Sequence, residues 1–281
     1  MASDASVGVV TGSSSGIGLA TALELARKGY FTYATVRNPA RAGALAEAAK
    51  ELSIAIVQLD VTDDYSVRRA VEQILKEKGR IDLLVNNAGY GLGGALEDSS
   101  MEEIKNQYET NVFGLIRTTQ AVLPAMRKRR SGTIVNISSA AGRIGYPGAS
   151  VYVSSKHSIE GLSEAMAYEL EPFGIRVVLV EPGVIKKNFG AGMIFAKKAQ
   201  DPNSPYSQMM QRMGGNWQYM MENGSSAELV AKVVLDAIES KDGTLRYLAG
   251  KDVEGWIQSR NSMPEAEFFK RMKQNLLGSE S

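Results

Sequence analysis

A tyrosine and a lysine, Tyr152 and Lys156, stand four positions apart, and Ser139 precedes the tyrosine by thirteen positions. On a helix, positions i and i+4 share one face, so the phenol and the ammonium would point into the same cleft. A tyrosine normally loses its proton near pH ~10, and a nearby cation lowers that pKa. This set could therefore act as a general acid or base near neutral pH. Such pairs also arise by chance on exposed helices, so the rest of the chain has to support the catalytic interpretation.

A glycine-rich segment, Thr11-Gly-Ser-Ser-Ser-Gly-Ile-Gly18, separates the first apolar run of the chain from a helical pattern. Gly12 suits a sharp turn, Gly16 lets the backbone approach a ligand, and Gly18 lets the helix pack near the strand. The free N–H groups and the positive end of such a helix favour a pyrophosphate. The motif therefore predicts a dinucleotide site, with a Ser/Gly turn that binds nothing as the alternative.

A dinucleotide site usually has a decisive residue about 20 positions after its glycines, where an acidic side chain would bind the ribose of NAD. This chain has Arg37 there, nineteen positions after Gly18. A guanidinium suits a 2′-phosphate, which favours NADP(H) over NAD(H). The alternative is a solvent-exposed arginine at a strand end. Asp60 follows the third apolar run and would either accept hydrogen bonds from adenine or cap the turn after it.

Short apolar runs alternate with longer amphipathic ones along the chain. We expect strands at 7–11, 31–36, 54–58, 83–86, 133–137, 176–180 and 245–248. We expect helices from the glycine-rich turn to 28, at 39–50, from Thr62 as N-cap to 78, and at 100–130 with a bend near 111–114. Two more helices are expected, one carrying Tyr152 and ending near 171, the other opened by a capping box at 225–228 and ending near 239.

This order predicts an α/β fold, because strands that alternate with helices build parallel sheets covered on both faces. We expect a single doubly wound Rossmann domain over residues 1–281, with a mostly parallel seven-stranded sheet and right-handed crossovers. No repeat and no linker divides the chain before about residue 185.

The composition excludes several other classes of protein. Lys and Arg number 32 against 31 Asp and Glu, so no basic surplus indicates nucleic acid or an anionic membrane as partner. The absence of Cys and the single His exclude disulfides, thiolate nucleophiles and Cys- or His-rich metal sites. No signal-peptide pattern and no membrane-spanning apolar run is seen. We therefore expect a cytoplasmic protein that binds no metal.

Taken together, the motifs resemble those of the short-chain dehydrogenase/reductase family over about residues 5–185. They match in order and spacing, and they are the glycine-rich segment 11–18, Asn86-Asn-Ala-Gly89, Asn111, Asn136-Ile-Ser-Ser139, Tyr152-x-x-x-Lys156 and Pro182-Gly183. Within the family, segments 33–37 and 152–161 are most similar to the 17β-hydroxysteroid and retinol dehydrogenase branch.

The resemblance implies a role for each matching residue. Tyr152 would be the general acid in carbonyl reduction and the base in alcohol oxidation. Lys156 would lower the tyrosine pKa and hold the nicotinamide ribose, Ser139 would hydrogen-bond the substrate oxygen, and Asn111 would anchor a water that links Lys156 to solvent. The implied cofactor-binding set is Gly12, Ser14, Ser15, Gly16, Ile17, Gly18, Arg37, Asp60, Val61, Asn87, Ala88, Gly89, Tyr152, Lys156, Pro182, Gly183 and Ile185.

The sequence departs from the family pattern at Lys187. The family usually has a threonine at this position, five residues after the proline, and that threonine holds the nicotinamide carboxamide. A lysine cannot accept a hydrogen bond, and it brings a cation toward a positively charged oxidised nicotinamide. We expect oxidised cofactor to bind less well, unless the loop shifts and another residue takes over. Lys187→Thr is then expected to tighten cofactor binding.

Two segments after the sixth strand would shape the substrate site. Residues 188–225 are rich in Met and stand where the family has its substrate lid. Methionine adapts to irregular apolar shapes, so a bulky apolar substrate is one interpretation and ordinary packing of one or two helices is the other. The helical tail at 253–277 is expected to pack against the body or another subunit.

The leading functional interpretation is an NADP(H)-dependent oxidoreductase that acts on an apolar alcohol/carbonyl pair, such as a steroid, a retinoid or an aliphatic ketone. One alternative is a reductase of 3-oxoacyl thioesters or other polar ketones, for which Lys186, Lys187, Lys197 and Lys198 would supply cations. A second alternative is a non-catalytic NADP sensor, although a sensor would not need Ser139, Tyr152 and Lys156. The family usually forms homodimers or homotetramers, which we expect here as well.

Overall fold

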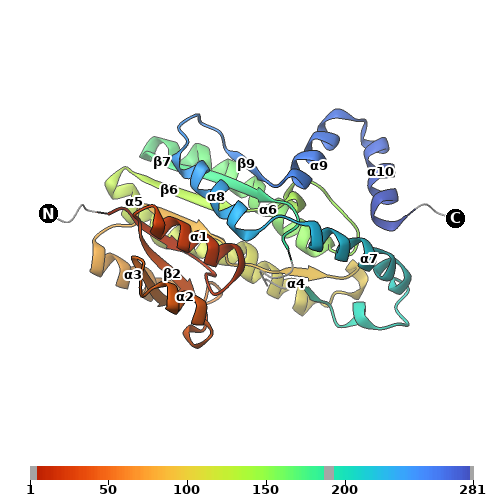
Figure 1. Cartoon of the computed structure of the whole chain (residues 1–281), viewed down its shortest axis with the longest axis horizontal. Helices are drawn as coiled ribbons and strands as arrows, with labels where there is room; N and C mark the ends of the chain where they lie inside the picture. Colours follow the sequence, from red (N-terminus) through yellow and green to blue (C-terminus); the bar gives the residue numbers. More distant parts are fainter. Residues whose placement is uncertain (1–4, 187–192, 279–281) are drawn as a thin grey trace.

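Seven parallel strands form the central sheet of the protein, in the order β3-β2-β1-β4-β6-β7-β9. The structure is a computed structural model that describes residues 5–186 and 193–278 (Figure 1). The strands are β1 (Val7–Val10), β2 (Phe31–Val36), β3 (Ile54–Gln58), β4 (Leu83–Asn86), β6 (Gly132–Ile137), β7 (Ile175–Pro182) and β9 (Arg246–Ala249). From β1 the sheet continues through β2 to β3, and from β4 it continues the other way through β6 and β7 to β9. The fold is therefore the predicted doubly wound α/β sheet with helices on both faces.

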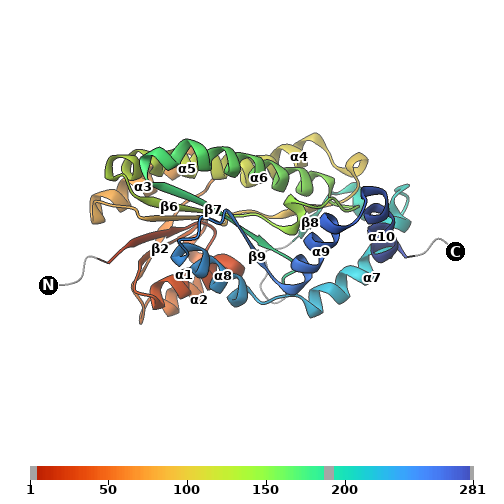
Figure 2. The same ribbon diagram turned by 90° about the horizontal axis from the view of Figure 1, so that it is seen from above.

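Two layers of helices cover the sheet (Figure 2). On one face, α1 (Gly16–Arg27), α2 (Gly43–Ala48) and α8 (Ala227–Glu239) pack on a core that includes Val10, Leu25 and Val234. On the other face lie α3 (Asp64–Lys78), α5 (Gly114–Arg129) and α6 (Ser150–Leu170). Burial of apolar side chains on both faces explains why the strands read as continuous apolar runs.

Three predicted helix starts were wrong. The helix expected at 39–50 is a 3-10 turn, Pro39–Arg41, followed by the short α2, and the break lies at Ala42, whose φ and ψ of −99° and 30° are not helical. Asp63, not Thr62, caps α3, since its carboxylate accepts from the N–H groups of Tyr65 and Ser66. The predicted capping box at 225–228 does not form: Ser226 caps α8 alone by accepting from the Leu229 N–H.

The bend predicted near 111–114 is a π-helical turn, Glu109–Phe113, between α4 (Met101–Tyr108) and α5. Ser100 and Glu103 form a capping box at the start of α4. π-Helical turns inside α-helices occur often at functional sites, and this one carries Asn111.

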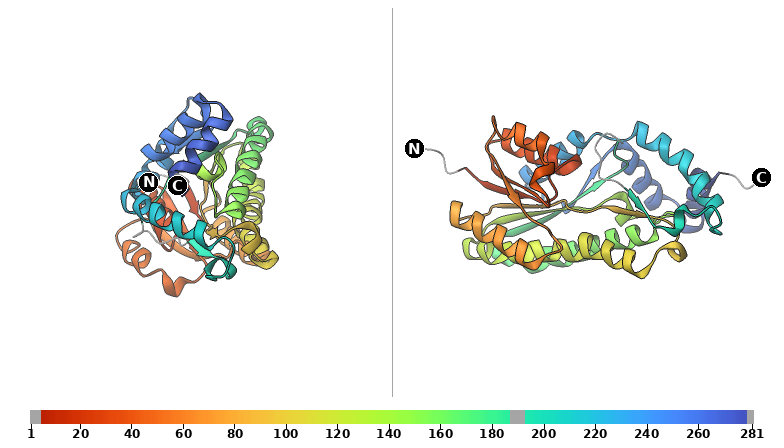
Figure 3. Two further views of the ribbon diagram at one scale, coloured as in Figure 1. Left: turned by 90° about the vertical axis from the view of Figure 1, so that its right-hand side faces the viewer. Right: turned by 90° about the horizontal axis from the view of Figure 1, so that it is seen from below.

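The sequence pattern missed a small parallel sheet of β5 (Gly91–Gly93) and β8 (Met193–Phe195), and it gave no bounds for the lid helix α7 (Ser207–Asn223). The predicted tail consists of two helices, α9 (Lys251–Ser262) and α10 (Glu265–Leu277), and Pro264 separates them. The side chain of Asn216 on α7 donates to the carbonyl oxygens of Asn275 and Leu276 at the end of α10. Lid and tail thus lie side by side at one end of the molecule (Figure 3).

Candidate active site

The glycine-rich turn has the geometry that close approach to a ligand requires. Gly12 and Gly16 have φ angles of +69° and +60°, which side chains other than glycine rarely adopt. A Cβ on Gly12 would lie 2.9 Å from the Cα of Ala88, and one on Gly18 would overlap the carbonyl oxygen of Gly12 and the side chain of Asn87. Close packing therefore requires glycine at positions 12 and 18, and the backbone conformation favours it at position 16.

Asn87 and Thr11 hold this turn in place. The Asn87 side chain donates to the carbonyl oxygens of Thr11 and Gly12 at 2.9 and 3.1 Å. The Thr11 hydroxyl accepts from the N–H groups of Asn87 and Ala88 at 2.9 and 3.0 Å. The sequence prediction assigned Asn87 and Ala88 to the cofactor pocket but missed Thr11, which is the polar residue that joins the two segments.

The side of the turn that faces away from the sheet is free for a ligand. Ser14 and Ser15 are exposed, and Ser15 precedes α1 without capping it. Ile17 lies between this surface and the core, where it packs on Ala20 and Ala231. Because no side chain caps the first N–H groups of α1, the turn fits the diphosphate of a dinucleotide.

At the adjacent end of the sheet, Arg37 and Asp60 differ in their surroundings. Arg37 is exposed after β2, and within residues 5–186 and 193–278 its guanidinium makes no hydrogen bond or ion pair. Asp60 accepts from the N–H and the hydroxyl of Thr62, so it caps the turn, as one of its two predicted roles required. Val61 is buried against Gly114, where a larger residue would collide with its side chain.

The catalytic candidates meet at the carboxyl end of β6. Tyr152 lies in the first turn of α6 and Lys156 one turn later, while Ser139 follows β6. The Ser139 hydroxyl hydrogen-bonds Tyr152 and also accepts from the Ala141 N–H at 3.1 Å. The structure therefore places the three residues together, as their spacing predicted.

The expectation that Lys156 lowers the Tyr152 pKa was wrong for this geometry. Burial raises the pKa of Tyr152, and the hydrogen bond with Ser139 opposes that shift in part. The Lys156 ammonium instead donates to the carbonyl oxygen of Ile137 at 2.8 Å and lies 5.8 Å from the centroid of the tyrosine ring. Tyr152 is consequently a neutral phenol near neutral pH and can donate a proton.

Lys156 is buried, with only 8% of its surface exposed. Burial lowers its pKa to about 8, and the carboxylate of Glu160, one helical turn further on, raises it in part. The charge on Lys156 therefore changes within a pH range that is accessible to assays.

Asn111 connects the segment after β4 with α6. Its amide nitrogen donates to the Tyr90 carbonyl oxygen at 2.9 Å and to the Ser155 hydroxyl at 3.3 Å, and its amide oxygen accepts from the Tyr90 N–H. Gly89 lies beside it, where a Cβ would be 3.0 Å from the Asn111 amide oxygen. The side chain thus positions the helix of Tyr152; the water that it would anchor stays a prediction.

A second buried polar network connects α6 to the central sheet. Asn86 and Asn136 are register partners in β4 and β6, and the Asn86 amide donates to the Asn136 side chain at 2.9 Å. Asn136 in turn donates to the Ser163 hydroxyl of α6 at 2.8 Å. Fully satisfied buried networks of this kind specify one arrangement of the elements that they join.

Two acidic residues behind the site were missed by the sequence analysis. Glu181 is fully buried in β7, where Arg143 and Arg246 approach its carboxylate to 3.2 and 3.6 Å. Arg246 also pairs with Glu160 at 2.9 Å, so the cluster reaches the helix of Lys156. The sequence signal that could have revealed Glu181 was the position of its carboxylate inside the apolar run 175–182.

The other missed acid is Asp252 on α9, which supports the loop after β7. Its carboxylate accepts from the Val184 N–H at 2.7 Å and overlaps the position that a Cβ on Gly183 would take. Ile185 forms an isolated bridge with Ser225. The loop from Pro182 to Ile185 is therefore held by residues distant in sequence, while Lys187 lies outside the described residues.

Ser139 and Tyr152 line a cavity of about 260 Å³, which we call the inner cavity. Its remaining walls are almost entirely apolar, and they come from the loop after β7, from α7 and from both tail helices. The lining side chains include Ile144, Tyr146, Val184, Ile185, Met193, Met213, Trp217, Met220, Met221, Trp256, Met272 and Leu276. The predicted tail thus packs on the body and closes the site.

The family model for short chain dehydrogenases matches residues 6–194, which contain the glycine-rich turn and Ser139, Tyr152 and Lys156. The chain belongs to the short-chain dehydrogenase/reductase family. Over 277 residues it is 39% identical to the uncharacterized oxidoreductase YusZ of Bacillus subtilis (strain 168), covering 96% of this chain and 98% of that protein.

Other members of the family extend the similarity. Bovine (Bos taurus) retinol dehydrogenase 8 is 34% identical, with 96% of this chain and 89% of that protein covered. Human (Homo sapiens) 17-beta-hydroxysteroid dehydrogenase type 1 is 36% identical, with 85% and 76% covered. The crystal structure of a short-chain dehydrogenase from Streptomyces avermitilis superposes with a TM-score of 0.84 at 33% identity, covering 97% and 98% of the chains.

Solved relatives differ in cofactor. A metagenomic short-chain oxidoreductase in complex with NADP has a TM-score of 0.68 at 27% identity, covering 88% of this chain and 98% of that one. A short-chain dehydrogenase/reductase from Burkholderia phymatum in complex with NAD has a TM-score of 0.77 at 26% identity, covering 92% and 93%. The chain is therefore an NAD(P)-dependent short-chain oxidoreductase.

The described residues contain neither a candidate membrane span nor a candidate metal site. Across 5–186 and 193–278, no helix is both long and apolar enough to cross a membrane. In the same ranges, no group of three or more His, Cys, Asp or Glu residues is arranged to hold a metal ion.

Proposed function

We propose that this short-chain oxidoreductase transfers hydride between NADP(H) and an apolar alcohol/carbonyl substrate. The observation that carries the proposal is the inner cavity, in which Ser139 and Tyr152 supply the polar groups and apolar side chains supply most of the wall. When bound, the nicotinamide supplies or accepts the hydride. The chain's own residues position the substrate oxygen and move the proton.

Tyr152 is the proton donor in the direction of carbonyl reduction. Because burial raises its pKa, the phenol is protonated near neutral pH and can donate to the substrate oxygen as negative charge develops there. The Ser139 hydroxyl hydrogen-bonds the phenol in this structure, and with substrate bound it would turn its single proton toward the substrate oxygen. In alcohol oxidation the deprotonated form of Tyr152 would accept the hydroxyl proton, and Ser139 would orient the hydroxyl group. The cation of Lys156 would hold the ribose beside them.

The preference for NADP(H) over NAD(H) rests on Arg37 and Ser14. Both are exposed beside the glycine-rich turn, and within the described ranges no other residue neutralises the Arg37 guanidinium. An exposed guanidinium is suited to a phosphate group, and no acidic residue stands at this position of β2 to bind ribose hydroxyls.

An apolar substrate is supported by the cavity walls and by two relatives. None of the described residues that line the inner cavity is a lysine or an arginine, and Lys197 and Lys198 are exposed outside it. The names of the bovine and human relatives refer to retinol and to a hydroxysteroid. Both observations favour an apolar ketone over a 3-oxoacyl thioester, which would need cations near the entrance.

The test is NADPH oxidation against a panel of apolar and polar ketones, with Tyr152→Phe as the catalytic variant. Tyr168→Phe is the matched control, because Tyr168 lies on the same helix but is 73% exposed. We expect turnover of apolar ketones that Tyr152→Phe abolishes while NADPH binding, followed by titration, persists. NADPH binding without turnover of any ketone would favour the sensor, and full activity of Tyr152→Phe would refute the mechanism.

Two further expectations stay predictions: one domain over residues 1–281, and a homodimer or homotetramer. Large apolar side chains are exposed on the layer that contains α4 to α6, among them Met101 (63% exposed), Phe113 (49%) and Tyr168 (73%). Sedimentation of the purified chain would measure its association state.

A further inference from the structure

A second cavity, of about 320 Å³, adjoins the inner one, and we call it the outer cavity. It is formed by the loop 146–149, by β8 with the 3-10 turn Lys198–Gln200 that follows, and by the first half of α7. The family resemblance places three of these segments in the substrate lid, but it assigns no chemical role to any individual residue in them. The outer cavity is therefore not explained by the chemistry described so far.

The two cavities share one wall of four side chains, Tyr146, Met193, Met213 and Trp217. The rings of Tyr146 and Trp217 lie 6.2 Å apart between centroids and are inclined by 30°, so they pack against each other at the boundary. Each of the four side chains contacts both spaces. The outer cavity therefore adjoins the inner one, and these four side chains lie between the two spaces.

The boundary is adjustable because two of its four side chains are methionines. Methionine has three rotatable bonds and no branch, so its side chain can move aside at low energetic cost. The backbone opposite is held by a hydrogen bond, which the Gly94 N–H donates to the Gly148 carbonyl oxygen at 2.7 Å. Gly148 lies close to α7, because a Cβ there would be 3.0 Å from the sulfur of Met210 and 3.1 Å from that of Met213.

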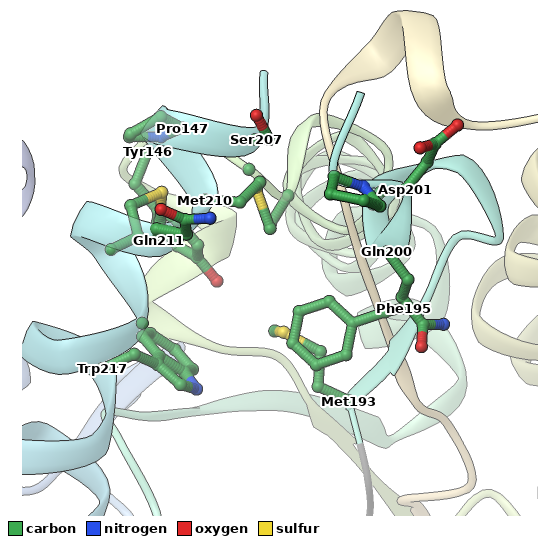
Figure 4. A pocket seen from close by; sticks show the side chains of 16 residues that line it. Tyr146, Pro147, Met193, Phe195, Gln200, Asp201, Ser207, Met210, Gln211 and Trp217 are labelled. Carbon is green, nitrogen blue, oxygen red and sulfur yellow. The ribbon is translucent and has the colours of Figure 1, made fainter. Parts of the chain in front are cut away.

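The outer cavity is apolar within and polar at its margin. Figure 4 shows Trp217 and Met210 of α7 on one side, facing Phe195 and Met193 of β8 on the other. Gln200 and Gln211 also belong to the lining; both are exposed, and neither side-chain amide is hydrogen-bonded within the described part of the chain. The carboxylate of Asp201 lies at the same margin and accepts from Asn203. An apolar segment would fit the interior, and a neutral polar end group would meet the two amides.

The volumes of the inner and outer cavities indicate the length of the molecule that they can hold. Sites for small molecules are usually about 300–1,000 Å³, so the inner cavity, at about 260 Å³, is small for an elongated substrate. Both cavities together suit an elongated molecule whose carbonyl lies at Tyr152 and whose other end passes the aromatic pair. This conclusion rests on the proposed function, because it takes the inner cavity as the place of reaction.

We propose that the outer cavity is a distal subsite for the far end of an elongated apolar ketone, with the Tyr146–Trp217 pair as the passage between the two parts. Substrates that reach past the pair bury additional apolar surface, which raises kcat/KM with chain length. Shorter ketones are confined to the inner cavity and gain none of this binding energy.

The test uses linear methyl ketones from hexanone to tetradecanone with NADPH and the full-length chain. Met210→Trp fills the outer cavity, since Met210 lines that cavity and not the inner one. Gln208→Trp is the matched control on the same helix, because Gln208 lines neither. Ala199→Leu fills the outer cavity from a different element, in case the tryptophan disturbs α7.

In the wild type, kcat/KM is expected to rise with chain length. The ratio of kcat/KM for the longest ketone to that for the shortest is expected to fall about tenfold or more in Met210→Trp and Ala199→Leu, and to stay unchanged in Gln208→Trp. Turnover without dependence on chain length, or the wild-type ratio in both filled variants, would overturn the subsite and leave the proposed function intact. Failure of every ketone to react with NADPH bound would overturn both.

Discussion

Lys156 and Glu160 lie one turn apart on α6, and the carboxylate opposes the effect of burial on the ammonium. Burial lowers the Lys156 pKa to about 8, and Glu160 is the group that raises it. The other charged groups that face Glu160 are Arg246 at 2.9 Å and, through electrostatic repulsion, Glu181. We therefore expect Glu160 to act on the reaction through Lys156, as a positioning residue.

Glu160→Gln is expected to move the alkaline limit of activity to lower pH. Without the carboxylate the Lys156 pKa falls further below about 8, so the cation is lost earlier as the pH rises. A shift of about one pH unit is expected in the alkaline limb of kcat/KM. Glu164→Gln is the control, because Glu164 pairs with Arg246 from the same helix but does not act on Lys156. An unchanged alkaline limb in Glu160→Gln would refute this role.

The sequence predicted the elements that carry the site because the relevant signals are local. The strands at 31–36, 54–58 and 83–86 have the predicted bounds, and the turn at Gly12, Gly16 and Gly18 follows from positive φ angles and close backbone packing. The spacing of Tyr152 and Lys156 is also local, since one helical turn determines it.

Non-local contacts were not predictable from spacing. Asp252 acts on Val184 from 68 positions away, and the tail reaches the cavity through its packing on α7 and on Ala140 and Ile144. The prediction that Lys156 lowers the Tyr152 pKa was wrong for a related reason. The direction in which the ammonium points depends on the Ile137 carbonyl oxygen, and no helical periodicity reveals that contact.

Arg37→Ala is expected to remove the preference for NADP(H). A hydrogen bond to a charged group contributes about 1.5–3 kcal/mol, so the Kd for NADPH should rise roughly 10- to 100-fold while that for NADH changes little. Fluorescence titration of both cofactors measures the two constants. Arg69→Ala, on an exposed position of α3, is the matched control. Equal weakening of NADPH and NADH binding would mean that Arg37 does not read the 2′-phosphate.

Asp252→Ala is expected to loosen the loop from Pro182 to Ile185 and to weaken cofactor binding. The substitution leaves the Val184 N–H without its acceptor at 2.7 Å, which costs about 1–3 kcal/mol for a buried donor. Thermal unfolding and NADP+ titration should both report the loss. Glu254→Ala, exposed on the same helix, should change neither. A lower melting temperature with unaltered NADP+ affinity would confine Asp252 to a role in stability.

Glu181 makes stability depend on pH, because burial raises its pKa from 4.5 to about 7. The folded chain then binds more protons at this group than the unfolded chain between these two values. The free energy of unfolding therefore falls as the pH rises through that window, and the full loss is present above pH 7. Its size is about 3 kcal/mol, since each pKa unit corresponds to about 1.4 kcal/mol.

Glu181→Gln removes this titration, so the wild type should lose about 3 kcal/mol relative to the variant between pH 4.5 and pH 8. Urea unfolding at the two pH values measures the difference, and comparing the two proteins cancels the titration of all other groups. Glu169→Gln, exposed on α6, should leave the wild-type pH dependence unchanged. A difference between wild type and Glu181→Gln that is the same at both pH values would show that the carboxyl group stays in one ionisation state, with Arg143 and Arg246 holding it charged throughout.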